Sequence, residues 1–391
     1  MSCPVRDPGD ERPADWDPLD ETVLADQRAA FDALRERCPV ARSDAFGWSV
    51  LRHAEVRRVL HDPATFSSAV SQHLSVPNGI DPPRHAAWRA MIEPWFADDR
   101  LAPFRPRCRA LADRLAGALA GRPDADLMDA FAGPFAAEAQ CAFLGWPSDQ
   151  AGPLREWTRA NHQAIRDGDR ERLGELARAF ERRVTAILDA RRGCAAETDA
   201  TCRLMHERVE GRAIRDEELV SLLRNWTVGE VGTIAAAAGI VVHYLATHPE
   251  LQQRLRAEPG LRPAAIDEIL RLDGPLVANR RVTTRATELG GRRLEAGERV
   301  TLMWIPANRD PAVFERPDEC RPDRDPGDNL LYGAGIHVCP GAPLARLELA
   351  VALEALFEAS AWIEPAPDEG AERAAWPAAG FERVPVRVVA P

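Results

Sequence analysis

Lysine is absent from this 391-residue chain, so all 50 basic residues are arginines, against 61 acidic residues. The net charge of −11 argues against a general nucleic-acid-binding protein, which would need a basic surface. The eight cysteines include no C-x-x-C pair, which excludes the usual zinc-ribbon and redox-dithiol patterns. We expect most of them to be free thiols.

An apolar signal sequence and a membrane span are also missing. The N-terminal stretch MSCPVRDPGDERPADWDPLD is acidic and rich in proline, without an apolar core. The most apolar run, NWTVGEVGTIAAAAGIVVHYL, is interrupted by Gly, Glu, Thr and His, unlike a span. We therefore expect a cytoplasmic protein with no membrane association.

Apolar residues recur at helical spacing over much of the chain. Such patterns predict helices within 25–38, 84–96, 104–121, 174–193 and 263–272. Strand-like runs are confined to 46–51, 281–304 and 381–389, and the middle run should turn at Gly290–Gly291 and Ala296–Gly297. Without a repeat or linker, the pattern predicts a single domain over 1–391, mainly α with a small β region.

The strongest chemical signal is YGAGIHVCPGAPLARLELA, which begins at Tyr332. Cys339 stands in a glycine-rich loop that leads directly into a predicted helix. Gly333 and Gly335 permit a tight turn, and a helix N-terminus stabilises a thiolate. Such a thiolate suits an axial haem ligand, whereas an isolated cysteine would more often be a buried structural residue.

The full spacing G-x-G-x-H-x-C-x-G, followed by APLARLE, resembles the haem-binding loop of the cytochrome P450 family. Tyr332 stands where the family usually has Phe. The resemblance extends over essentially the whole chain. It implies the helical prism fold of bacterial P450s, with haem b held between a long central helix and the loop of Cys339, the axial iron ligand.

The resemblance also assigns residues around the loop. In DEILRL, Glu268 and Arg271 resemble the family's E-x-x-R helix, and Arg324 matches the arginine that completes a buried structural network. Cys320 stands where that segment usually has Phe. Gly333 should lie against the haem. Four residues match the partners of the haem propionates, which arginine binds through charge-assisted hydrogen bonds: His85, Arg89, Arg281 and His337. Each of these alone could instead be a surface charge or a hydrogen-bonded histidine.

TVGEVGT, residues 227–233, resembles the family's central-helix pattern [A/G]-G-x-[D/E]-T-[T/S]. Thr233 falls on the threonine at the oxygen-binding side of the haem. The usual acid position is Gly232, and a carboxylate stands instead at Glu230. Thr233 and Glu230 are therefore candidate catalytic residues for proton delivery. Alternatively, Thr233 is a helix-bonded core hydroxyl, and Glu230 forms an ion pair with an arginine or is solvated.

The resemblance places a mainly apolar substrate pocket near Thr233. Its candidate residues are Asn225, Val228, Gly229, Leu276, Val277, Asn279 and Phe381. The two asparagines should either orient a polar substituent or bond backbone.

Together these features predict a haem-thiolate monooxygenase that inserts one oxygen atom from O2 into a small hydrophobic organic substrate. The chain contains no flavin or iron–sulfur motif, so electrons should come from a separate ferredoxin and ferredoxin reductase using NAD(P)H. Four arginines have two interpretations, as a docking patch for an acidic partner or as solvated surface residues. They are Arg105, Arg107, Arg109 and Arg346.

Gly232 motivates one alternative function, a peroxide-driven or otherwise atypical haem-thiolate oxidase. Two more are a non-catalytic haem-thiolate ligand-binding protein and a haem-free structural protein.

Overall fold

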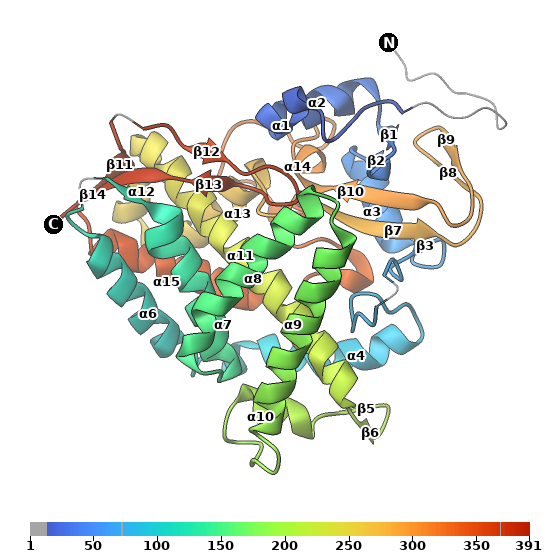
Figure 1. The fold of residues 1–391 in the computed structure, drawn as a ribbon. Helices are drawn as coiled ribbons and strands as arrows, with labels where there is room; N and C mark the ends of the chain where they lie inside the picture. Colours follow the sequence, from blue (N-terminus) through green and yellow to red (C-terminus); the bar gives the residue numbers. More distant parts are fainter. Residues whose placement is uncertain (1–13, 72, 123, 368) are drawn as a thin grey trace.

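The computed structural model describes residues 14–71, 73–122, 124–367 and 369–391 (Figure 1). Cys3 and the first part of the N-terminal stretch that was searched for a signal core lie outside these residues.

Most of the described chain is helical. The α-helices are α1 (Glu21–Ala25), α2 (Gln27–Arg37), α3 (His53–His61), α4 (Arg84–Ile92), α5 (Asp98–Leu101), α6 (Arg105–Leu119), α7 (Gly133–Leu144), α8 (Ala151–Arg166), α9 (Arg170–Asp189), α10 (Ala200–His206), α11 (Asp216–Thr247), α12 (Pro249–Ala257), α13 (Arg262–Leu272), α14 (Trp304–Ala307) and α15 (Ala342–Glu358). Short 3-10 or π turns are η1 (Glu93–Phe96), η2 (Met128–Ala132), η3 (Ser148–Gln150), η4 (Pro259–Leu261), η5 (Pro326–Asp328) and η6 (Gly335–His337). The helices predicted from periodicity are confirmed as α2, α4, α6, α9 and α13.

The largest sheet has the order β1-β2-β10-β7-β3. Its strands are β1 (Val40–Ser43), β2 (Gly47–Val50), β3 (Phe66–Ser67), β7 (Ala278–Thr283) and β10 (Arg299–Met303). β10 runs parallel to β2 and antiparallel to β7. The smaller pairings use β4 (Ala125–Asp126), β5 (Arg208–Val209), β6 (Arg212–Ala213), β8 (Thr287–Leu289), β9 (Arg292–Leu294), β11 (Trp362–Pro365), β12 (Glu372–Arg373), β13 (Phe381–Arg383) and β14 (Pro385–Val389). The predicted turns are confirmed, because Gly290, Gly291 and Gly297 all have positive φ.

α11 is the central element of the helical part, and it contacts α7, α8, α9, α13 and α15 (Figure 1). Its first turn carries three acidic residues, and the positive end of the helix dipole stabilises their negative charges. Glu218 in this turn accepts hydrogen bonds from Arg212 and Arg215, and these partners lower its pKa to about 2. α11 is long and apolar enough to span a membrane, but 61% of its most apolar window is buried inside the molecule. Its position is therefore that of a core helix.

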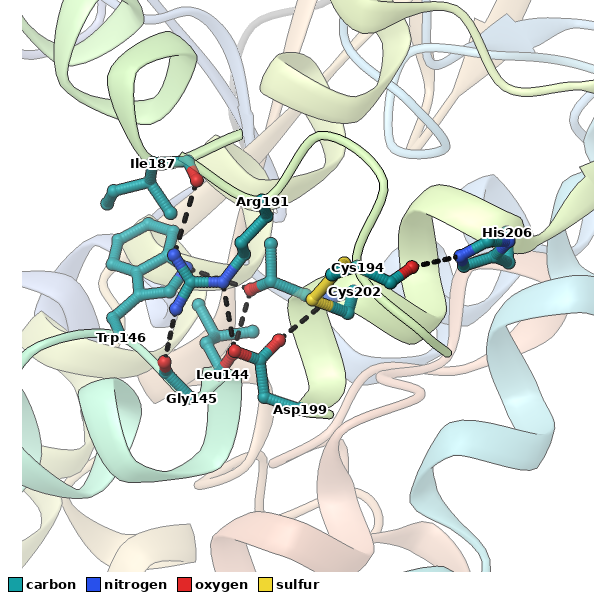
Figure 2. Close-up of a disulfide and its surroundings, with 10 residues drawn as sticks. Leu144, Gly145, Trp146, Ile187, Arg191, Cys194, Asp199, Cys202 and His206 are labelled. Atoms are coloured by element: carbon teal, nitrogen blue, oxygen red, sulfur yellow. Dashed lines mark hydrogen bonds and ion pairs between the residues drawn. A yellow bond between two sulfur atoms is a disulfide. The ribbon is translucent and has the colours of Figure 1, made fainter. Parts of the chain in front are cut away.

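A disulfide joins Cys194, after α9, to Cys202 in α10 (Figure 2). Arg191 reinforces the same connection, because it pairs with Asp199 at 2.9 Å and donates to the Gly145 carbonyl. Asp199 in turn caps α10 by accepting from the Cys202 N–H. The expectation of free thiols holds for Cys108, Cys141, Cys320 and Cys339.

A buried charge network holds α13 against the segment before the Cys339 loop. Glu268 accepts two hydrogen bonds from Arg271, at 2.8 and 2.9 Å, and one from Arg324 at 2.9 Å. The other donors of Arg271 reach the carbonyl oxygens of Asn308, Pro317 and Glu319. Each side-chain nitrogen and oxygen of Glu268, Arg271 and Arg324 thus has a hydrogen-bond partner, as a buried ionic group requires.

Glu268→Gln is expected to lower the free energy of unfolding by about 3–5 kcal/mol, because it leaves two buried arginines without their counter-charge. Urea denaturation would measure the loss. Glu319→Gln is the matched control: its carboxylate pairs with Arg316 at 2.9 Å on the surface, and such pairs contribute at most about 1 kcal/mol. Equal, small losses in the two variants would contradict a structural role for the network.

Candidate active site

Cys339 lies in the loop between η6 and α15. Its N–H donates to the Tyr332 carbonyl at 2.8 Å, which closes the loop. Gly335 has φ +69°, and a Cβ there would lie 2.3 Å from the Leu60 carbonyl oxygen in α3, so glycine is required. The N–H groups of Gly341 and Ala342 donate to the sulfur at the start of α15. These donors and the helix dipole favour a thiolate.

The sulfur of Cys339 faces an interior space. It is accessible to solvent, yet burial is the main influence on its pKa and raises it. Two apolar side chains around it are also unusually exposed, Val338 beside it at 38% and Val228 on α11 at 48%. A large apolar group between the loop and α11 would cover both.

Asp267 on α13 ties the Cys339 loop in place. Its carboxylate accepts from Arg346 at 2.9 Å, and its carbonyl accepts from Asn329 at 3.2 Å. Tyr332, at the start of the loop motif, directs its hydroxyl toward the same carboxylate at 3.5 Å, and the Arg346 guanidinium stacks 4.5 Å from its ring centroid. The polar group on Tyr332 therefore has a local partner that phenylalanine would lack.

His85 on α4 and His337 in the loop form a cluster with the cations Arg89 and Arg281. Their rings lie 4.3 Å apart, and the Nε2 atoms of both are buried without a hydrogen-bond partner in the described part of the chain. Burial lowers the pKa of both histidines, and that of His337 falls to about 3 because His85 and Arg281 add positive charge. Arg281 is buried, and its side chain has one hydrogen bond, to the Arg280 carbonyl.

This cluster lacks a matching negative charge. Asp81 is the acid nearest to Arg281, but Ser67 and the Ser68 N–H already engage its carboxylate. Arg89 pairs with Glu93 at 3.0 Å and donates to the Val338 carbonyl, so it anchors the loop as well. The carboxylates of a ligand would supply the missing partners for His85, His337 and Arg281.

Thr233 lies on α11, one turn after Gly229. Its hydroxyl donates to the Gly229 carbonyl and approaches the Glu230 carbonyl at 3.3 Å. Such a bond competes with the helix ladder, and the two glycines of GEVG lower helix stability further, by roughly 1 kcal/mol each against alanine. The Thr233 hydroxyl thus lies at a weakened point of α11, one turn from Gly229 and the exposed Val228.

Relatives identify the family. The protein-family model described as Cytochrome P450 matches residues 261–372 of this chain. A cyclomarin C epoxidase of Salinispora arenicola is 33% identical, over 85% of this chain and 88% of the relative. An erythromycin C-12 hydroxylase of Saccharopolyspora erythraea is 34% identical, over 85% of this chain and 88% of the relative. The chain belongs to the cytochrome P450 family.

The fold of this P450 agrees with solved members. The open form of P450 EryK from S. erythraea has a TM-score of 0.85 at 30% identity, covering 98% of this chain and 99% of that chain. The predicted mainly α P450 fold and its small β region are therefore confirmed. So is the assignment as a haem-thiolate P450 monooxygenase that uses haem b.

The residues on the walls of the site fit haem b. Cys339 offers the thiolate, Val338 and Val228 offer apolar cover, and the unpartnered His85, His337 and Arg281 suit the two propionates. Gly333 has φ +71° and open space on the side where a Cβ would stand, apart from Trp304 at 3.8 Å and the His337 carbonyl. Bound haem supplies the iron at which O2 is activated.

Glu230 and Gly232 lie on nearly opposite faces of α11 in this P450, about 200° apart at 100° per residue. The Glu230 carboxyl is within hydrogen-bonding reach of Glu348 on α15. Among the described residues, no donor reaches three of their four oxygens. Glu230 thus has neither of the partners expected for it, an arginine or bulk water. Burial raises the pKa of both carboxyls, which favours a proton held on this pair.

The two asparagines expected in the pocket differ in their surroundings. Asn225 donates to the Val76 carbonyl at 2.8 Å and to Ser75 at 3.2 Å, so its amide ties α11 to the loop between β3 and α4. Asn279 is exposed on β7, and its side chain has no hydrogen bond in the described structure. Of the two, Asn279 is the better placed to bind a ligand.

The apolar residues predicted to line the pocket also fall into an exposed and a buried group. Leu276, like Val228, is exposed. Val277 is buried in a cluster with residues of α2 and β10. Phe381 is buried too, with its ring 4.3 Å from that of His243 and 4.3 Å from the Arg373 guanidinium. Val277 and Phe381 therefore support the pocket wall more than they line it.

Sequence reasoning missed two residues next to the central helix. Glu348 follows Cys339 by nine positions, and an acid within the apolar run LELAVALEALF was the available signal. His162 on α8 packs against Gly232. It had no local signal, because only the tertiary structure brings these residues together.

The variant Glu230→Gln is expected to be more stable than the wild type at alkaline pH, by an amount that shrinks as pH falls. A raised folded-state pKa means that the folded wild type holds more protons than the unfolded chain above about pH 4.5. Stability is therefore lost as pH rises through this range. Relief of one buried carboxyl should be on the order of 1–3 kcal/mol. Urea denaturation of both proteins across pH would measure it, and a pH-independent difference would exclude the shared proton.

Proposed function

We propose that this P450 is a cytoplasmic monooxygenase that inserts one oxygen atom from O2 into a small, mainly apolar organic compound. Two electrons and two protons accompany each O2, giving the oxidised substrate and water. The strongest support is that the accessible Cys339 sulfur lies close enough to α11 for Glu230 to act on its pKa, and that α11 also carries Thr233 and the exposed Val228.

The substrate is proposed to be a natural product of the kind that the relatives oxidise. The relatives in question are named as epoxidase of cyclomarin C and hydroxylase of erythromycin. In this chain the exposed Val228 and Leu276 offer apolar contacts, and Asn279 offers one amide to orient a polar substituent. Substrate contacts of this type are typical of small-molecule pockets.

Electrons are proposed to arrive from a ferredoxin reduced by an NAD(P)H-dependent reductase. Two of the four candidate docking arginines already have acidic neighbours: Arg109 pairs with Asp113 and Glu358, and Arg346 pairs with Asp267. Arg105 and Arg107 are exposed, with no ion pair among the described residues. They stand at the start of α6, which packs on α15, so they are the better candidates for an acidic partner.

Thr233 and Glu230 are proposed as catalytic residues. The Thr233 hydroxyl would hold and pass a proton on the oxygen-binding side. The Glu230–Glu348 pair would keep a proton close to the same turn of α11, because its burial disfavours ionisation.

Thr233→Ala is expected to lower the product formed per NAD(P)H by about tenfold or more, with hydrogen peroxide released instead, because proton delivery loses its hydroxyl. Thr247→Ala is the control, since Thr247 makes the same type of bond, to His243, at the far end of α11. A substrate found by spin-state titration against aromatic, terpenoid, fatty-acid and macrocyclic compounds would serve for both.

Glu230→Gln should also slow turnover while haem binding persists. Turnover with hydrogen peroxide but none with ferredoxin, reductase and NAD(P)H would overturn the monooxygenase proposal.

A further inference from the structure

The face of α11 on which P450 relatives usually carry an acid, at Gly232, is covered by α8 (Figure 1). A Cβ built on Gly232 would lie 3.7 Å from Thr158 Cγ2 and 3.8 Å from His162 Cε1. Thr158 and His162 are four residues apart on α8, so they share one face. The space beside Gly232 is therefore bordered by one methyl group and one imidazole.

Only the imidazole of this pair can exchange a proton. The Thr158 hydroxyl is already committed, because it donates to the Leu154 carbonyl at 2.9 Å. His162 has no hydrogen bond to any other residue in the described structure, so both ring nitrogens are available to water or to a neighbouring hydroxyl. Gly232 directly precedes Thr233 in α11, so the imidazole packs beside the residue before the candidate catalytic threonine.

His162 is partly exposed and lies near two charged side chains. The charged groups that act on it within the described chain are Glu382 on β13, which raises its pKa, and Arg166 on α8, which lowers it. These two side chains pair with each other at 3.4 Å and are partly exposed, at 33% for Arg166 and 53% for Glu382. Burial is the largest influence and lowers the pKa of His162, and an imidazole is the side chain best suited to gaining and losing a proton near physiological pH.

Glu230 does not face the space beside Gly232. It lies about 200° around α11 from Gly232, and its carboxyl faces the buried Glu348. Any role of Glu230 in proton delivery is therefore separate from the usual acid position.

We propose that His162 replaces the absent acid at position 232, and that it passes protons from solvent at the Arg166–Glu382 pair to the hydroxyl of Thr233. This inference rests on the proposed monooxygenase function. In each transfer the imidazolium gives up one N–H proton, through a water molecule, to the Thr233 oxygen, which passes on its own proton. The neutral imidazole then accepts a proton from water beside Glu382. His162 acts through Thr233, so it is a positioning and relay residue rather than a catalytic one.

The central experiment compares the wild type with His162→Gln, which keeps a polar side chain of similar size but does not titrate. With O2, ferredoxin, reductase and NAD(P)H, the variant should form about tenfold less product per NAD(P)H. Its rate should lose the wild-type decline with rising pH and show a larger solvent deuterium isotope effect. Turnover driven by hydrogen peroxide should stay within about twofold, since that oxidant brings its own protons.

Two further variants separate the relay from packing. Thr158→Ala removes the methyl contact with Gly232 and should leave the pH profile and product yield unchanged. Gly232→Asp in the His162→Gln background restores an acid at the usual position, where a Cβ meets only ordinary contacts, and should recover most of the lost yield. Failure of this rescue, or an equal loss in Thr158→Ala, would assign His162 to packing alone.

A readout independent of turnover is the titration of His162 by NMR in protein labelled at histidine. Glu382→Gln should lower the pKa of His162, because Glu382 raises it. A His162 signal that does not titrate would overturn the relay. Wild-type protein that turns over with O2 but is matched by His162→Gln would also overturn the relay and leave the proposed function intact. Wild-type protein that works only with peroxide would overturn both.

Discussion

The backbone N–H groups at the start of α15 hold the sulfur of Cys339, and the other features of the molecule depend on this interaction. Gly341 and Ala342 can donate to the sulfur only if the loop before them is fixed. The fixing comes from α13, whose Asp267 binds the loop and its flanking helix, and from a buried network at Glu268. A thiolate in this setting is stabilised by these N–H groups and by the positive charge of Arg89, which suits a metal ligand.

α11 separates two proton environments. One face presents Glu230 to Glu348, where two carboxyls share a buried space. The face at Gly232 presents bare backbone to His162, which lies near the exposed Arg166 and Glu382. The carboxylate at 230 is therefore not the usual acid of the family moved by two positions, since two residues along a helix turn a side chain to the other side.

Local patterns in the sequence were sufficient where chemistry depends on spacing. The glycines around Cys339, the i,i+3 pair of Glu268 and Arg271, and the turns at Gly290–Gly291 follow from steric and helical rules that act over a few residues. Pairings between distant segments could not be predicted in this way. Nothing near Glu230 in the sequence indicated Glu348, and nothing near Gly232 indicated His162. Asn225 and Phe381 were placed in the pocket by resemblance, whereas Asn225 bonds the loop between β3 and α4, and Phe381 packs on His243.

The central claim is that the Cys339 sulfur is the haem ligand. The most direct test is the absorption difference spectrum of the reduced, haem-loaded protein with and without carbon monoxide. The account predicts the strongly red-shifted band of a thiolate ligand in the wild type and its loss in Cys339→Ala. Absence of that band from the wild type, or its persistence in Cys339→Ala, would contradict the account.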